Sequence, residues 1–289
     1  MSKKSGRTLK ETIAAERAGP VESALIKATD SEASAPKEKH VKKLVAYSFK
    51  PNALLTIAKM LKERSEKKTW IPVLKTLIVT HRLFRDGAAN FIRVMADMSP
   101  FNRGYFEDAT SAESQQLSVF IQRYSIYLNQ RVQGFTKLGF DYTHSSSIKE
   151  GDDLARMSPP DVFTNLEIVL DQMSAILDIT NGEEINSVVG SLIVQQAATL
   201  LFKDVMKLWV LANAASCNIL ERFFKLEKRE AQTALRLYEQ FIKACDSTEK
   251  FVDICKLVGC TDGKSIPDGL GDAGRKILPK LQEHLKTMG

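Results

Sequence analysis

The chain has 289 residues, of which 44% are hydrophobic, so it holds enough apolar material for a sizeable core. No window approaches the ~18–20 uninterrupted apolar residues of a membrane-spanning helix, so we expect no integral membrane protein. The N-terminus lacks an apolar segment of the kind found in secretory signals. The four cysteines (Cys217, Cys245, Cys255 and Cys260) form no Cys-x-x-Cys pair, so we expect reduced core residues and no zinc site.

The positive charge is concentrated at one end of the chain. Of the net charge of +6, residues 1–50 contribute +5, from eleven lysines and arginines against six acids. A localised basic segment suggests an anionic partner, which could be a lipid headgroup, nucleic acid or an acidic protein. A solvated, disordered basic tail is the alternative explanation.

The first predicted helices flank a polar loop. Residues 21–28 read as a short helix with Lys27 in its last turn, and the next helix should start at Ser34 or Pro36, since proline is favoured at a first helical position. Its expected buried residues are Val41, Leu44 and Val45. A third helix should begin at Trp70, after a Thr69 N-cap, and stop near Gly87.

Helical periodicity continues through the rest of the chain, and strand-type alternation is essentially missing. We expect further helices over 117–135, 166–177, 183–215, 216–226, 228–245, 247–258 and 276–287, with loops at 151–153, 158–160 and 262–274. The sequence therefore predicts an all-α protein in which about ten helices stack as a solenoid. A break at about 143–160 could separate an N-terminal from a C-terminal helical layer.

No pattern typical of catalysis is present. Residues 269–274 read GLGDAG, but neither the strand nor the downstream acid of a dinucleotide site accompanies them. His81 lies on an apolar stripe and is predicted to be a buried core residue, while His144 and His284 have no evident partner. Nothing pairs a nucleophile with a base, so we expect a non-enzyme with no cofactor and no metal.

Several lysines lie near the end of the polar loop, around the start of the helix expected to begin at Ser34 or Pro36. Lys37, Lys39, Lys42 and Lys43 are predicted to lie exposed around the start of that helix, where positive charge opposes the helix macrodipole. The arrangement is unfavourable unless an anion binds. Backbone N–H groups, lysines and the His40 imidazole would together make a site for several phosphates.

The loop resembles a known signature. Lys27-Ala28-Thr29, six intervening residues, and then the segment PKEKH at 36–40 are similar to the phosphoinositide-binding motif of the ANTH domain of the CALM-type clathrin-assembly phosphoproteins. Further segments that fit this family lie at 70–87, 118–132, 200–209 and 266–269, so the resemblance covers nearly all of the chain. It implies an ANTH/ENTH-like fold, a right-handed superhelical solenoid of about ten helices.

The resemblance also implies a non-catalytic membrane-recruitment module for clathrin-mediated endocytosis. Its ligand would be phosphatidylinositol 4,5-bisphosphate, held at the surface by Lys27, Lys37, Lys39 and His40. The protein would be cytoplasmic and peripheral at the plasma membrane and at clathrin-coated pits or vesicles. Glu38 departs from the most basic family members, where another lysine is common.

Residues 1–18 are predicted to be a flexible or amphipathic basic segment, and 19–289 the ANTH domain, with layers at about 19–145 and 160–289. Leu9 and Ile13 lie one helical turn apart among basic residues, which is the pattern of a shallowly inserting helix. The candidate accessory membrane contacts are Lys42, Lys43, Arg7, Leu9, Lys10 and Ile13.

The family also suggests protein partners. In some members a C-terminal helical layer holds a vesicle SNARE, and the corresponding surface here would include Leu220 and Cys245, although both are equally ordinary core residues. Clathrin and adaptor complexes would bind through a tail outside these 289 residues.

Three alternatives remain. One is an actin-linked endocytic ANTH protein, which generally lacks the lysine–histidine loop, and another is a helical SNARE or protein scaffold without lipid specificity. The third, a nucleic-acid-binding scaffold, is disfavoured because residues 1–46 contain no aromatic side chain for base stacking.

Overall fold

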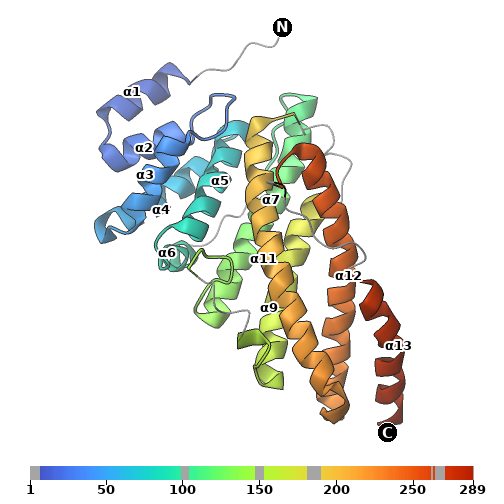
Figure 1. The fold of residues 1–289 in the computed structure, drawn as a ribbon. Helices are drawn as coiled ribbons and strands as arrows, with labels where there is room; N and C mark the ends of the chain where they lie inside the picture. Colours follow the sequence, from blue (N-terminus) through green and yellow to red (C-terminus); the bar gives the residue numbers. More distant parts are fainter. Residues whose placement is uncertain are drawn as a thin grey trace. The chain divides into compact units, whose positions relative to one another are not determined.

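The computed structural model describes residues 7–98, 104–146, 153–180, 190–261, 263 and 271–288. Within these ranges all regular secondary structure is helical, with eleven α-helices and two short 3-10 helices (Figure 1). Among them no helix combines the length and the apolar character needed to cross a membrane. The predicted all-α class is confirmed.

The chain divides into two compact units. Unit 1 comprises residues 1–145 and 181–200, and unit 2 comprises residues 146–180 and 201–289. The long helix α11 (Leu192–Arg222) therefore contributes its first residues to unit 1 and the others to unit 2. The domain boundaries proposed from the sequence remain a prediction.

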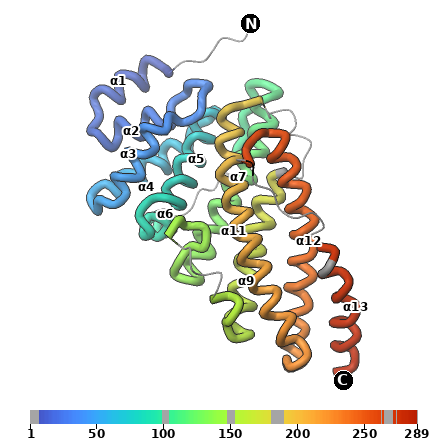
Figure 2. Tube along the Cα trace, viewed as in Figure 1, coloured from blue at the N-terminus to red at the C-terminus, as the bar shows by residue number. Residues whose placement is uncertain are grey.

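Unit 1 is a stack of helices, most of them short. They are α1 (Leu9–Arg17), α2 (Pro20–Ala28), α3 (Glu38–Ser48), α4 (Pro51–Ser65), α5 (Trp70–Asp86), α6 (Phe91–Asp97) and α7 (Ala112–Leu138). From α2 to α5, each helix packs against the next helix and the next but one, and the tube in Figure 2 can be followed through these turns. Contacts of this range are those of a helical solenoid, as predicted.

Helix α5 forms the centre of unit 1. It contacts α2, α3, α4, α6 and α7, so it is buried on nearly all sides and its polar side chains need partners within the protein. His81 is fully buried, as predicted, and its Nδ1 lies 2.8 Å from the hydroxyl oxygen of Tyr124. At the C-terminus, a Cβ on Gly87 would lie 2.5 Å from the Leu83 carbonyl oxygen, which explains why glycine ends this helix.

The predicted starts of two helices were wrong. Helix α3 begins at Glu38, with Lys37 as its N-cap residue, because residues 29–37 are held in an irregular loop by contacts described below. Val41 and Leu44 are buried, as predicted, whereas Val45 is only half-buried. The proline pair predicted as a loop begins helix α9 (Pro159–Leu177), since proline at the first helical position loses no hydrogen bond.

Unit 2 contains longer helices than the sequence suggested. Helix α11 continues without a break to Arg222, where the 3-10 helix η2 (Phe223–Lys225) follows. Helix α12 is continuous over Lys228–Val258, so the breaks predicted near 216 and 246 were wrong. Buried packing along the whole length of α12, against α9 among others, outweighs the weak helix propensities of single residues. The first part of the predicted helix 183–215 lies outside the described residues.

The C-terminal part of unit 2 ends in α13 (Asp272–Thr287), which packs against α12. Part of the GLGDAG segment lies outside the described residues, and the rest forms the first turn of α13. The 3-10 helix η1 (Asp178–Thr180) follows α9. Cys245, Cys255 and Cys260 are buried free thiols, whereas the exposed Cys217 contradicts the prediction that all four cysteines lie in the core.

Helix α7 is tied to the segment after it by a buried ion pair. The α7 helix ends at Gly139, whose φ of 81° favours glycine, and the chain turns back toward Asp141. Arg131 Nη2 lies 2.6 Å from Asp141 Oδ2, and the guanidinium also stacks over Phe84, 5.4 Å from the ring centroid. Both charged side chains are almost fully excluded from water.

Replacing Arg131 with methionine should destabilise the protein by about 3–5 kcal/mol, because it removes the charge partner of a buried carboxylate. Urea unfolding followed by circular dichroism measures this. The double variant Arg131→Met/Asp141→Asn should recover part of the loss. A single variant as stable as the wild type would contradict the stabilising role of this pair.

Candidate anion-binding site

The candidate site lies in unit 1 at the loop that joins α2 to α3. Lys27 is in the last turn of α2, as predicted, and Lys37, Lys39 and His40 lie at the start of α3. No side chain caps the N-terminus of α3. The first turn of this helix therefore presents backbone N–H groups next to three basic side chains, which favours an anion.

Several cations act on the half-buried imidazole of His40. Its pKa is lowered first by burial and then by the positive charges of Lys39, Lys27, Arg7 and Lys43. These four cations therefore lie close enough to act on one imidazole. The structure brings together three of the predicted phosphate ligands and adds Arg7 and Lys43, which the sequence suggested only as accessory contacts.

The fourth predicted ligand, Lys37, is engaged by an acid of the same loop. Its Nζ lies 3.3 Å from Glu32 Oε2, and both side chains remain partly exposed to water. An exposed pair of this kind contributes little stability, about 0–1 kcal/mol. Glu32 thus pairs with one of the four predicted phosphate ligands.

Glu38 is paired with an arginine of α5. The Arg82 guanidinium on α5 donates to both of its carboxylate oxygens, over 3.0 and 3.1 Å, and also to Asp86 over 2.8 Å. Burial alone would lower the pKa of Arg82, but its two acidic partners raise it overall. The acid that departs from the family pattern is therefore compensated by an arginine and directed toward α5.

Helix α1 is folded and docked against α2. Thr8 and Glu11 form a capping box at its start, and Ala15 is buried. Leu9 is 76% exposed and Ile13 is 40% exposed, so both apolar side chains reach the surface, as an inserting helix would require. Lys10 on α1 and Lys42 on α3 are exposed.

A buried ion cluster underlies the loop. Asp30 is 2% exposed and accepts hydrogen bonds from Arg7 at 2.7 and 2.9 Å and from Lys75 Nζ at 2.7 Å. Burial alone would raise the pKa of Asp30, but Lys75 and Arg7 hold it below its usual value. Lys75 also donates to the Glu32 carbonyl oxygen at 2.6 Å, and burial lowers its pKa despite these partners.

A second cluster holds the start of the loop. The Arg64 guanidinium on α4 donates to the hydroxyl of Thr29 at 2.9 Å, to the Thr29 carbonyl and to Glu11 at 3.0 Å. Glu11 in turn accepts from the backbone N–H of Ser31 at 3.2 Å. Burial alone would raise the pKa of Glu11, but hydrogen bonds from Arg64 and from the backbone N–H groups of Ser31 and Thr8 lower it overall.

Sequence reasoning missed both clusters. One signal was available, because Lys75 is the only charged residue in the apolar run 73–79 of a helix predicted to be central. A lysine in such a position is almost never buried without a partner. The identity of that partner could not be read from the sequence, since Asp30 lies 45 residues earlier.

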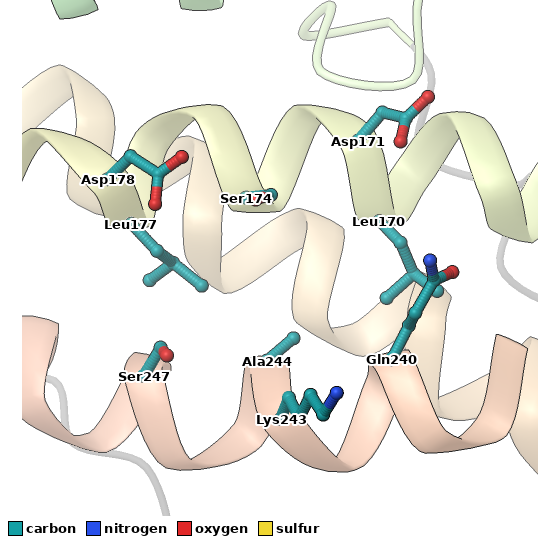
Figure 3. A pocket seen from close by; sticks show the side chains of 9 residues that line it. All are labelled: Leu170, Asp171, Ser174, Leu177, Asp178, Gln240, Lys243, Ala244 and Ser247. Carbon is teal, nitrogen blue, oxygen red and sulfur yellow. The ribbon is translucent and has the colours of Figure 1, made fainter. Parts of the chain in front are cut away.

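Unit 2 holds a different kind of hollow, a groove of about 220 Å³ between α9 and α12 (Figure 3). Leu170 and Leu177 point into it from α9 (Figure 3). Asp171 and Asp178 stand on one rim, and Lys243 stands on the other. Carboxylates on the rim make this groove unsuitable for a multivalent anion, so the basic loop of unit 1 is the stronger candidate site.

The two residues suggested for a SNARE surface both lie in unit 2. Cys245 on α12 is fully buried, and burial raises the pKa of its thiol to about 11. Leu220 on α11 is half-buried. This environment favours the core explanation for Cys245, while the SNARE surface itself remains a prediction.

The stacked helices and the cations around His40 define a helical module with a candidate surface site for a multivalent anion. The profile of the ANTH domain matches residues 20–287, so the chain belongs to the ANTH domain family. This result confirms the resemblance carried by the loop motif.

The relatives include large clathrin-assembly proteins. The human clathrin coat assembly protein AP180 is 32% identical over 98% of this chain and 31% of its own length. The human phosphatidylinositol-binding clathrin assembly protein is 31% identical over 98% of this chain and 44% of its own length. The chain therefore spans less than half the length of these two relatives.

Solved structures show the same fold. The ENTH domain of epsin-2, in complex with phosphatidylinositol 4,5-bisphosphate, matches with a TM-score of 0.68 and 15% identity, over 90% of this chain and 100% of that domain. Helical ANTH and ENTH tubules on membranes containing the same lipid match with a TM-score of 0.64 and 15% identity, over 93% of this chain and 99% of that chain. The predicted ANTH/ENTH-like fold is confirmed.

Replacing Glu32 with glutamine should strengthen the binding of a multivalent anion by roughly two- to fivefold, because Lys37 no longer has to leave an internal partner. Isothermal titration with inositol 1,4,5-trisphosphate measures the change. Glu107→Gln, an exposed substitution with the same change in net charge, is the control. Equal gains in both variants would show a general charge effect and contradict the specific role of Glu32.

Proposed function

We propose that this chain is a membrane-recruitment module of clathrin-mediated endocytosis that binds phosphatidylinositol 4,5-bisphosphate. The observation that carries the proposal is the group of four cations around His40 at the uncapped start of α3. The ANTH family membership and the printed names of the clathrin-assembly relatives support it. The bisphosphorylated headgroup is the multivalent anion that this cluster suits.

Each predicted ligand has a defined part in this proposal. Lys27 and Lys39 supply positive charge beside His40, and Lys37 joins them once Glu32 releases it. Lysines near an anionic surface contribute about 1 kcal/mol each, so a few of them give reversible, salt-sensitive binding. We propose a non-catalytic role for this surface cluster, in line with the clathrin-assembly names of the relatives.

The docked α1 helix adds accessory contacts in this proposal. Leu9 and Ile13 would enter the interfacial region of the bilayer, while Arg7, Lys10, Lys42 and Lys43 would face anionic headgroups. The protein would be cytoplasmic and peripheral at the plasma membrane and at coated pits or vesicles. Clathrin and adaptor binding would belong to segments outside this chain, and a vesicle SNARE at the Leu220 surface remains a separate prediction.

Sedimentation with liposomes tests the lipid site directly. The wild type should bind vesicles with phosphatidylinositol 4,5-bisphosphate far better than vesicles without it. Lys37→Glu/Lys39→Glu should weaken this binding at least roughly tenfold, because two attractive charges become repulsive. Lys276→Glu/Lys280→Glu, which reverses two exposed lysines of α13 in unit 2, should have a much smaller effect. Binding that ignores both the lipid and the loop variants would refute the proposed function.

His40 should make the binding depend on pH. In the free protein its pKa is lowered by burial and by neighbouring cations, and a bound polyanion would raise it. Binding then takes up a proton, so affinity should increase a few-fold as the pH falls from about 7.5 to about 6.

The comparison with His40→Gln isolates this effect, because protonation of the ligand's own phosphates affects both proteins equally. Titrations with inositol 1,4,5-trisphosphate at several pH values should show a steeper gain for the wild type. Parallel pH profiles would contradict a role for His40 in contacting the phosphates.

A further inference from the structure

The loop between α2 and α3 is contacted from within the protein by a buried lysine, Lys75. Lys75 lies within α5 and is only 1% exposed. Its ammonium group contacts the loop at two points, the Asp30 carboxylate at 2.7 Å and the Glu32 carbonyl oxygen at 2.6 Å. A lysine is rarely buried so deeply, because an ammonium group that leaves water loses a large hydration energy.

The burial of this ion pair is not a good source of stability. Replacing both members of a buried ion pair with apolar side chains is often neutral or stabilising, so stability alone does not explain why this pair is present. The geometry that the pair imposes concerns the loop backbone. The two contacts of Lys75 fix residues 30 and 32, and Arg64 fixes Thr29 by bonds to its hydroxyl and its carbonyl.

The loop needs such a hold, because the side chains that it aligns repel one another. Lys27, Lys39, Lys43 and Arg7 all act on the His40 imidazole in the same direction. Cations that act on one imidazole also repel one another, which favours a more open loop. The Asp30 carboxylate lies beneath this group and binds Arg7 as well as Lys75, so it opposes the repulsion from within the protein.

We propose that Lys75 is a positioning residue of the headgroup site, which acts through Asp30 and the Glu32 carbonyl to hold the loop in its binding conformation before the ligand arrives. This inference rests on the proposed function. Lys75 is buried and does not itself contact the ligand. Its effect is preorganisation, since a loop that is already ordered loses less conformational entropy when the phosphates bind.

Preorganisation predicts that a Lys75 variant loses affinity for the trisphosphate but not for anionic vesicles in general. Lys75→Met removes the hold on the loop and leaves every surface cation in place. Binding of inositol 1,4,5-trisphosphate should weaken by roughly five- to tenfold, because the loop must then be ordered on binding. Binding to vesicles of phosphatidylserine and phosphatidylcholine, which does not require an ordered headgroup site, should change by less than about twofold. Amide hydrogen exchange at residues 29–37 should accelerate.

Two further variants keep the test decisive. Asp30→Asn/Lys75→Met removes both buried charges, so it should fold even if the single variant is unstable, and it should show the same loss of trisphosphate affinity. Leu77→Ala creates a cavity on another face of α5 and controls for general destabilisation. It should keep the wild-type affinity at temperatures where all variants are folded.

The outcomes distinguish the positioning role of Lys75 from the proposed function. If the wild type binds the trisphosphate and both Lys75 variants bind it equally well, the positioning role is wrong and the proposed function stands. If Leu77→Ala loses as much affinity as Lys75→Met, the effect is general instability, and the inference is again overturned. If the wild type does not bind the trisphosphate at all, the proposed function fails and this inference fails with it.

Discussion

The arrangement of the candidate site depends on one carboxylate. Asp30 is buried between two cations, Arg7 from the segment before α1 and Lys75 from α5, and so links three parts of unit 1 that are distant in the sequence. Without this group, Arg7 and the buried ammonium of Lys75 would lose the carboxylate that both of them contact. A carboxylate in a buried position is stable only because both partners donate directly to it. The site is therefore a surface feature supported by a buried interaction.

The acids around the loop differ in the cations that they bind and in their exposure to water. Asp30 and Glu11 bind buried or half-buried cations and shape the loop, Glu38 is paired with Arg82, and Glu32 holds Lys37 at the surface. Of these acids, Glu32 is the one whose partner, Lys37, is a predicted phosphate ligand. A net charge calculated for the segment does not distinguish these cases, because it counts each acid equally. The distinction comes from exposure, since water screens the Glu32 pair and not the Asp30 pair.

Much of the fold and part of the site could be predicted from the sequence. The periodicity of 70–86 and 117–135 led correctly to two long helices, and the burial of His81 followed from its place on an apolar stripe. The errors came from local signals that packing overrides: the Ser-Pro-Pro segment starts a helix, and α12 continues past a predicted break. For the site, the motif indicated Lys27, Lys37, Lys39 and His40, but neither the pairing of Lys37 with Glu32 nor that of Arg7 with Asp30 was visible.

The sequence by itself determined the class of the protein and the location of its basic loop, because helical periodicity, chain charge and motif spacing are local properties. Only the tertiary structure decided which charges meet. Lys75 and Asp30 are 45 positions apart, and Arg64 and Glu11 are 53 apart, so no periodicity connects them. Their pairing depends on how α1, α4 and α5 pack around the loop. Because a buried charge must keep its partner, these buried pairs restrict the position of the loop.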